Sequence, residues 1–212
     1  MKRIALIALM TLFSFGAYAQ NAWQIKAGIN RSRWDGYIST RMLTGYEVGV
    51  ARSFKLVWVL SLQPSLTFSA KGAKIDMIFG EKSNARQYYL ELPVMLNARI
   101  PIGSSLAFNF AAGPYFAYGI AGRIHGTIPT VWYDNMQTTL VEAMPRSIFG
   151  KNGLKRFDSG LEFSVAFEIG AFGFGADYQF GFTTLSRSYD DRFFLGKSLR
   201  NISLSIWTGY KF

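Results

Sequence analysis

The sequence has no cysteine, a single histidine at position 125, and few charged residues, 17% of 212. The absence of cysteine excludes disulfide frameworks, thiolate metal sites, cysteine nucleophiles and a lipid anchor on an N-terminal cysteine. A lone histidine excludes a metal site built from several histidines. No phosphate-binding loop or metal motif is present either, so we expect no cofactor and no metal.

Long apolar runs are also missing beyond the N-terminus. A helix that crosses a bilayer needs about 18 or more apolar residues, and the best stretch, residues 56–62, is interrupted by Ser61. The chain is nevertheless half hydrophobic and 17% aromatic, which is high for a soluble protein because such side chains cannot all be buried. Disorder and helical membrane crossing are therefore both excluded.

The first nineteen residues are organised like a secretory signal peptide. Lys2 and Arg3 form a basic start, residues 4–15 are apolar but too short to span a bilayer, and Ala17-Tyr18-Ala19 is a cleavage site of small residues. We expect residues 1–19 to direct export and residues 20–212 to form one domain. The alternative is an uncleaved anchor helix.

The rest of the chain alternates apolar with small or polar residues, a period of two that is typical of β-strands. In the last segment the apolar frame is Ile202, Leu204, Ile206, Thr208, Tyr210 and Phe212, and the other frame is Ser203, Ser205, Trp207, Gly209 and Lys211. Seven more segments repeat the pattern, within residues 23–30, 46–51, 58–69, 88–99, 105–119, 161–170 and 172–182. Strands of about ten residues suit a tilted membrane crossing.

The connections between these segments alternate in length. Three are short, around residues 54–57, 100–104 and 170–172, and four are long, at residues 31–43, 70–87, 120–157 and 184–200. Short periplasmic turns and long external loops are typical of outer-membrane barrels. Large apolar residues lie opposite Glu, Lys, Asn, Gln and Gly, the reverse of a soluble lipocalin-like barrel.

The sequence therefore predicts an all-β fold, an eight-stranded antiparallel transmembrane β-barrel with up-and-down topology. Aromatic residues near the strand ends are expected to form interfacial girdles: Trp23, Trp58, Tyr88, Tyr118, Phe182 and Tyr210. A ten-stranded barrel, with an extra hairpin from residues 120–157, is the architectural alternative. That apolar loop could also fold inward as a plug or dock a partner.

Charged residues on the polar frame form the nearest thing to a functional site. Three cations and five carboxylates are expected inside the barrel: Lys26, Arg99 and Lys211 with Glu47, Glu91, Glu162, Glu168 and Asp177. Because buried charges must pair, we expect Glu91 to pair with Arg99 or Lys26. The set is either a salt-bridge plug or a narrow ion path lined by carboxylates.

The C-terminus and several internal motifs resemble known outer-membrane proteins. A terminal Phe212, with Tyr210 two residues before it, resembles the sorting signal that the barrel-assembly machinery uses during biogenesis. The motifs Tyr89-Leu90-Glu91-Leu92-Pro93-Val94, Gln63-Pro64 with Phe68-Ser69-Ala70-Lys71-Gly72, Ala112-Gly113-Pro114-Tyr115 and Asp158-Ser159-Gly160-Leu161 resemble the porin-family outer-membrane barrels of Bacteroidota, which include PorT-like proteins. Membership in the PorT-like subgroup would imply a part in type IX protein secretion.

Catalysis and the basic balance give two further hypotheses. His125 with Asp134, Glu142 and Ser147 has no defined spacing and no nucleophile elbow, so we expect no enzyme. Fifteen basic residues fall in predicted external loops or strand tips, where anionic lipopolysaccharide is the expected partner and nucleic acid is not: Arg31, Arg33, Arg41, Lys71, Lys74, Lys82, Arg86, Arg123, Lys151, Lys155, Arg156, Arg187, Arg192, Lys197 and Arg200.

Function follows from the fold only in outline. We expect an integral outer-membrane protein without a catalytic role, acting as a structural or interaction component or as an accessory of secretion. Its expected partners are outer-membrane lipid and lipopolysaccharide, the assembly machinery, and secretion-system or cell-surface proteins. A small porin-like channel for ions or small solutes is the alternative.

Overall fold

A computed structural model describes residues 22–36, 40–76, 82–125, 127–131, 138–142, 148–149, 153–186 and 199–212. The predicted signal peptide at residues 1–19 lies outside this part of the chain. Among the described residues no helix is long and apolar enough to cross a membrane.

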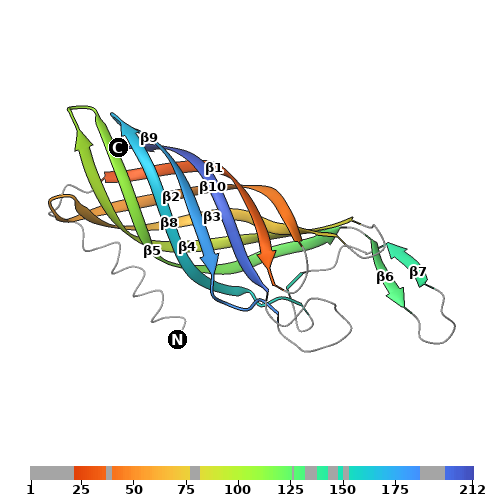
Figure 1. Cartoon of the computed structure of the whole chain (residues 1–212). Coiled ribbons are helices and arrows are strands. Elements are labelled where there is room, and N and C mark those ends of the chain that lie inside the picture. Colours follow the sequence, from red (N-terminus) through yellow and green to blue (C-terminus); the bar gives the residue numbers. More distant parts are fainter. Residues whose placement is uncertain are drawn as a thin grey trace.

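Ten β-strands make up the described structure. They are β1 (Ala22–Asp35), β2 (Thr40–Val57), β3 (Leu60–Asp76), β4 (Lys82–Ile102), β5 (Leu106–His125), β6 (Thr127–Val131), β7 (Thr138–Glu142), β8 (Phe157–Ile169), β9 (Phe172–Gly181) and β10 (Arg200–Lys211). Eight of them close an antiparallel barrel in the order β1-β2-β3-β4-β5-β8-β9-β10, and β10 pairs with β1 (Figure 1). The predicted eight-stranded up-and-down barrel is confirmed.

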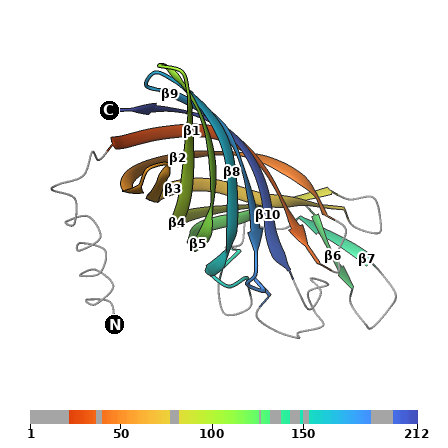
Figure 2. The same ribbon diagram turned by 60° about the vertical axis from the view of Figure 1, so that its left-hand side comes forward.

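The loop at residues 120–157, called the third loop below, does form a hairpin, as the ten-stranded alternative supposed, but this hairpin lies outside the barrel. Strands β6 and β7 pair only with each other in the described structure, as a separate two-stranded sheet. Figures 1 and 2 both place this hairpin beyond the barrel end opposite the C-terminus. The barrel is therefore not ten-stranded. We call that end the loop end, and the end with the short connections the turn end.

Alternation along each strand separates a lipid-facing from a luminal face. In β8, Phe163, Val165 and Phe167 are exposed on the outside, whereas Glu162 and Glu168 are buried inside. The same holds in β10, where Leu204 and Ile206 are exposed and Ser205 is buried. Exposed apolar side chains on every barrel strand form the surface that lipid would cover.

Several predicted connections are wrong in length because the strands continue past the apolar belt. Strands β1 and β2 leave only residues 36–39 between them, and β3 and β4 leave only residues 77–81. Outside the belt the outward residues become polar, as at Arg31, Arg33 and Arg86, so the apolar alternation fades while the pairing persists.

The turns at the other end are tight. Trp58, predicted to lie within a strand, is in the β2–β3 turn, has a φ of 33° and is 93% exposed. Gly103 and Gly170 have φ values of 72° and 59° in the other two turns, a region that glycine enters without steric cost. At this end Trp23 and Phe212 exchange two backbone hydrogen bonds, of 3.1 and 2.9 Å, which close the β1–β10 seam.

Candidate functional site

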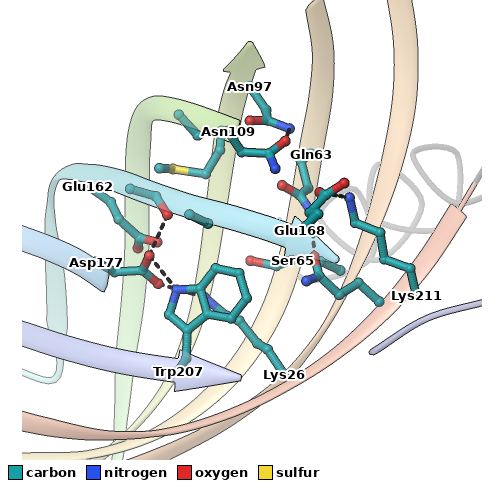
Figure 3. A pocket seen from close by; sticks show the side chains of 16 residues that line it. Lys26, Gln63, Ser65, Asn97, Asn109, Glu162, Glu168, Asp177, Trp207 and Lys211 are labelled. Atoms are coloured by element: carbon teal, nitrogen blue, oxygen red, sulfur yellow. Dashed lines mark hydrogen bonds and ion pairs between the residues drawn. The ribbon is translucent and has the colours of Figure 1, made fainter. Parts of the chain in front are cut away.

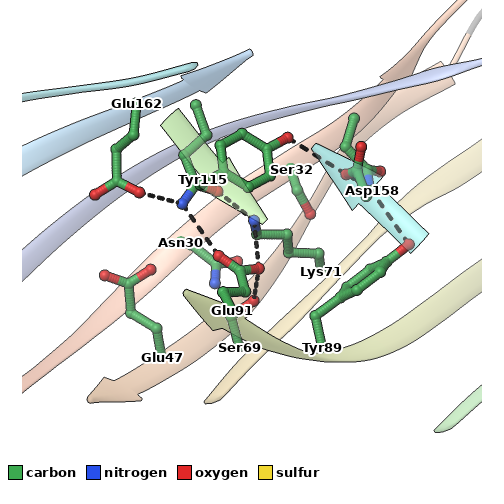
Figure 4. A network of polar contacts seen from close by, with 12 residues as sticks. Asn30, Ser32, Glu47, Ser69, Lys71, Tyr89, Glu91, Tyr115, Asp158 and Glu162 are labelled. Carbon is green, nitrogen blue, oxygen red and sulfur yellow. Dashed lines mark hydrogen bonds and ion pairs between the residues drawn. The ribbon is translucent and has the colours of Figure 1, made fainter. Parts of the chain in front are cut away.

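The barrel lumen is filled by polar side chains that the period-two pattern directs inward. At its centre, Lys71 Nζ on β3 lies 2.6 Å from Glu91 Oε1 on β4. Ser69 donates to Glu91 Oε1 at 2.5 Å, and Lys71 also donates to Gln179 Oε1. Gln179 Nε2 in turn donates to Glu91 Oε2 at 3.1 Å and to Glu162 Oε2 at 2.6 Å (Figure 4). We call these five residues the central network.

Towards the loop end, the central network meets two tyrosines. Lys71 Nζ lies 5.3 Å from the centroid of the Tyr115 ring, a favourable cation–π distance. Tyr115 and Asn201 both donate to Asp158 Oδ2, at 3.3 and 2.8 Å, and Asn201 donates to the Tyr89 hydroxyl at 3.4 Å. All four side chains are buried, so this layer leaves little free volume.

An apolar cap closes the barrel above the tyrosines. Part of the third loop folds into the mouth, where Ile148, Phe149 and Leu154 are buried against barrel residues; the other members include Trp34, Ile75, Tyr89, Tyr115, Leu185 and Leu199. Phe149 packs edge-on against Tyr89 with ring centroids 5.9 Å apart. It also covers Gly119 so closely that a Cβ there would lie 2.2 Å from Phe149 Cζ. The loop at residues 120–157 therefore has two parts: one folds inward over the barrel mouth, as the predicted plug does, and the other forms the β6–β7 hairpin.

A second charged group lies towards the turn end. Lys26 Nζ pairs with Asp177 Oδ2 at 3.0 Å, while Ser164 and Trp207 Nε1 donate to Asp177 Oδ1 at 2.5 and 2.7 Å (Figure 3). Glu47 accepts from Ser205 at 2.8 Å. Asp177 therefore joins three neighbouring strands from within the lumen.

The turn end opens into a small cavity. Glu168 bridges two cations there, Arg99 at 2.9 Å and Lys211. The cavity has a volume of about 40 Å³, and its lining includes Asn97, Asn109, Glu168, Trp207 and Lys211. A water molecule needs about 10–15 Å³ by this measure, so the space suits a few waters.

The structure places all eight predicted luminal charges on the inner face, but it pairs them differently. Lys26 pairs with Asp177, and Arg99 and Lys211 pair with Glu168. The predicted pairing of Glu91 with Arg99 or Lys26 is wrong, because Glu91 contacts Lys71. Lys71 comes from the adjoining strand β3, in a stretch that the sequence predicts to be an external loop, so it was not among the predicted partners of Glu91.

Sequence reasoning missed two luminal charges, Lys71 and Asp158. The prediction that Lys71 belongs to an external loop is wrong, because Lys71 lies inside the barrel and its side chain is 2% exposed. The frame Gln63, Ser65, Thr67, Ser69 continues directly into Lys71, and this continuation was the available signal. With these two included, the described lumen holds four cations and six carboxylates.

The described structure gives no support to a metal site or to the catalytic candidates His125, Asp134, Glu142 and Ser147. No group of three or more His, Cys, Asp or Glu side chains that could hold a metal occurs in the described part of the chain. Asp134 and Ser147 lie outside the described residues, and the side chains of His125 and Glu142 are not described.

Comparisons with known proteins agree with the barrel. A family model described as outer membrane protein beta-barrel domain matches residues 18–187. A search of curated proteins finds no match.

Solved structures with similar chain paths are outer-membrane proteins. OprG from Pseudomonas aeruginosa is 11% identical, with 92% of this chain and 98% of that chain covered and a TM-score of 0.48. Neisserial surface protein A is 10% identical, with 91% and 97% covered and a TM-score of 0.46. Ail of Yersinia pestis, solved with the heparin analogue sucrose octasulfate, is 13% identical, with 91% and 99% covered and a TM-score of 0.42.

Proposed function

The chain belongs to the outer-membrane β-barrel domain family, and we propose that within it this protein is a closed barrel that acts as a structural or interaction component and neither conducts nor catalyses. The observation that carries the proposal is the filled lumen. The central network, the tyrosine layer and the apolar cap succeed one another from the middle of the barrel to the loop end.

The closed lumen weighs against the alternative of a small channel. An eight-stranded barrel has an interior just wide enough for its own side chains. Here Tyr89 and Tyr115 are fully buried across that interior, and Lys71 and Glu91 are nearly so. An ion would have to break a buried ion pair, which strongly destabilises such a site.

The outer parts of the molecule are left to make the interactions. The turn end faces the periplasm and the loop end faces outward, as in barrels of this kind. Strands β6 and β7 project beyond the loop end (Figure 1), where a partner could pair with or cover them. We infer a role as an accessory of secretion from the resemblance of the sequence motifs to the Bacteroidota porin family, which includes PorT-like proteins, with export through the signal peptide at residues 1–19.

Planar-bilayer recording of the purified protein tests closure. The wild type should show no unitary conductance steps. A variant with all three layers trimmed, Lys71→Ser and Glu91→Ser in the central network, Tyr89→Ser and Tyr115→Ser in the tyrosine layer and Phe149→Ser in the cap, serves as the positive control and should conduct once it forms a barrel. Heat-modifiable gel migration establishes that each variant forms a barrel. Reproducible steps from the wild type would overturn the closed-barrel proposal.

Affinity isolation from the native outer membrane tests the interaction role. The tagged protein is crosslinked, solubilised in mild detergent and analysed by mass spectrometry, alongside a variant with residues 128–141 replaced by two glycines. A partner at fixed ratio whose crosslinks fall on the loop end, and which is lost from the shortened variant, supports the role. Recovery of the barrel alone would contradict it.

A further inference from the structure

Charges in the described barrel are sorted by face. Of the seven carboxylates whose side chains are described, six are buried in the lumen and Asp35 alone is exposed. The outer face near the loop end instead carries exposed cations: Arg31, Arg33, Arg41, Lys74, Arg86 and Arg123. The outer wall at this level is therefore strongly positive.

Two pairs of these cations lie directly opposite each other. Arg86 on β4 is the cross-strand partner of Arg123 on β5, and Arg41 on β2 is the partner of Lys74 on β3. Gly72 is the partner of Arg86 on its other side, so Lys74, two residues further along β3, is its diagonal neighbour. Like charges directly opposite on one face destabilise a sheet. An anion between them would turn that repulsion into attraction.

The position along the barrel indicates which anion. Just inside the cations an aromatic row crosses β2, β3 and β4, with ring centroids 6.2 Å apart for Tyr46–Phe68 and 6.0 Å for Phe68–Tyr88. Tyrosine rings on a membrane protein lie at the level of the lipid head groups. Arg86 comes two residues beyond Tyr88, about 7 Å further out at the strand rise, which is within the head-group layer.

We propose that Arg86 and Arg123, with Lys74 beside them, form a binding site for a phosphate group of the lipopolysaccharide in the outer leaflet. Planar guanidinium groups donate two parallel hydrogen bonds to phosphate oxygens. Two arginines opposite each other on neighbouring strands can hold one phosphate from both sides. Neither arginine has an ion pair with another described residue. The site depends on the outer-membrane location and is independent of whether the lumen conducts.

The test measures lipid A retention in phosphatidylcholine nanodiscs. Wild-type protein is reconstituted with a trace of bisphosphorylated lipid A, with dephosphorylated lipid A, or with phosphatidylglycerol at equal charge, and bound lipid is measured by native mass spectrometry. The variant Arg86→Gln/Arg123→Gln removes the site. The matched control Arg31→Gln/Arg33→Gln removes the same charge from the same outer face of β1.

The proposal expects the wild type to retain bisphosphorylated lipid A at least tenfold more tightly than either other lipid. Arg86→Gln/Arg123→Gln should lose about tenfold in affinity, and the β1 control should stay within about twofold. Equal losses in both variants would show a diffuse charge belt and overturn the site. Equal retention of dephosphorylated lipid A, or of phosphatidylglycerol, would overturn the assignment to the lipopolysaccharide phosphate. Circular dichroism and heat-modifiable migration confirm that both variants fold.

Discussion

Lys71 Nζ lies 2.6 Å from Glu91 Oε1 at the centre of the barrel, and these side chains are only 2% and 1% exposed. Each partner offsets part of the cost of burying the other's charge. Gln179 links the pair to Glu162, so the ion pair also ties β3 and β4 to strands across the lumen. The pair therefore both blocks the lumen and links strands on opposite sides of the barrel.

Breaking this pair from one side should be costly. We expect Lys71→Met to lower the free energy of unfolding by about 3–5 kcal/mol, because Glu91 would remain buried and charged without its cation. Lys71→Met combined with Glu91→Met should cost less than Lys71→Met alone. The measurement is urea unfolding in phospholipid vesicles, followed by tryptophan fluorescence. Additive losses in the double variant would contradict the pairing.

The ion pair at the turn end gives a contrasting prediction. Arg99 binds Glu168 at 2.9 Å, but the Arg99 side chain is 48% exposed and Lys211 also contacts the same carboxylate. Water and salt screen such a pair, so Arg99→Gln should lower the unfolding free energy by less than about 1 kcal/mol. A loss as large as that of Lys71→Met would show that the two pairs are not energetically distinct.

The Trp207 ring packs so closely against Gly175 on β9 that even an alanine side chain would clash there. A Cβ at Gly175 would lie 2.6 Å from Trp207 Cζ2 and 2.8 Å from Ala166 Cβ. Gly175→Ala should therefore destabilise the barrel by about 1–3 kcal/mol in the same urea assay. Gly173, on the same strand and face, is the control: its nearest contact is the flexible end of Gln24 at 3.2 Å. Gly173→Ala should change stability by less than about 0.5 kcal/mol, and a similar loss at both positions would refute the steric argument.

The apolar cap can be tested with a single reporter because the chain has no cysteine. Ala117 is buried beneath the cap, so a thiol from Ala117→Cys should react slowly with a membrane-impermeant maleimide. Adding Gly119→Val must displace the Phe149 ring and should raise the labelling rate at least tenfold. Thr44→Cys, on the exposed outer face, should label rapidly in both backgrounds. Rapid labelling of Ala117→Cys without the second change would show that the mouth is open.

Sequence could predict which residues face lipid and which face the lumen, because a slip of one residue would exchange the two faces of a strand. Polarity could not predict strand length. On the outer face of β1 the isoleucines at positions 25 and 29 are followed by Arg31 and Arg33, so the outer face is no longer more apolar than the inner face. The luminal pairing could not be predicted either. Glu91 contacts Lys71 on the adjoining strand and Gln179 on a strand across the barrel, and these contacts depend on the strand register, which the alternation pattern does not give. The apolar cap forms because a loop folds back onto Gly119, and the period-two pattern of the strands does not predict how a loop folds.

The predicted sorting role of Phe212 can be tested separately from any role in stability. Its backbone closes the β1–β10 seam through Trp23, whereas its side chain is 65% exposed on the outer face. Phe212→Ala keeps both backbone hydrogen bonds, so its unfolding free energy after refolding into vesicles should change by less than about 1 kcal/mol. In cells, the resemblance of Tyr210 and Phe212 to an assembly sorting signal predicts that the amount of assembled Phe212→Ala protein falls several-fold. Phe167→Ala, which also removes an exposed outer aromatic but far from the C-terminus, should leave cellular assembly unchanged. Equal cellular losses in the two variants would show that Phe212 contributes only membrane-facing surface.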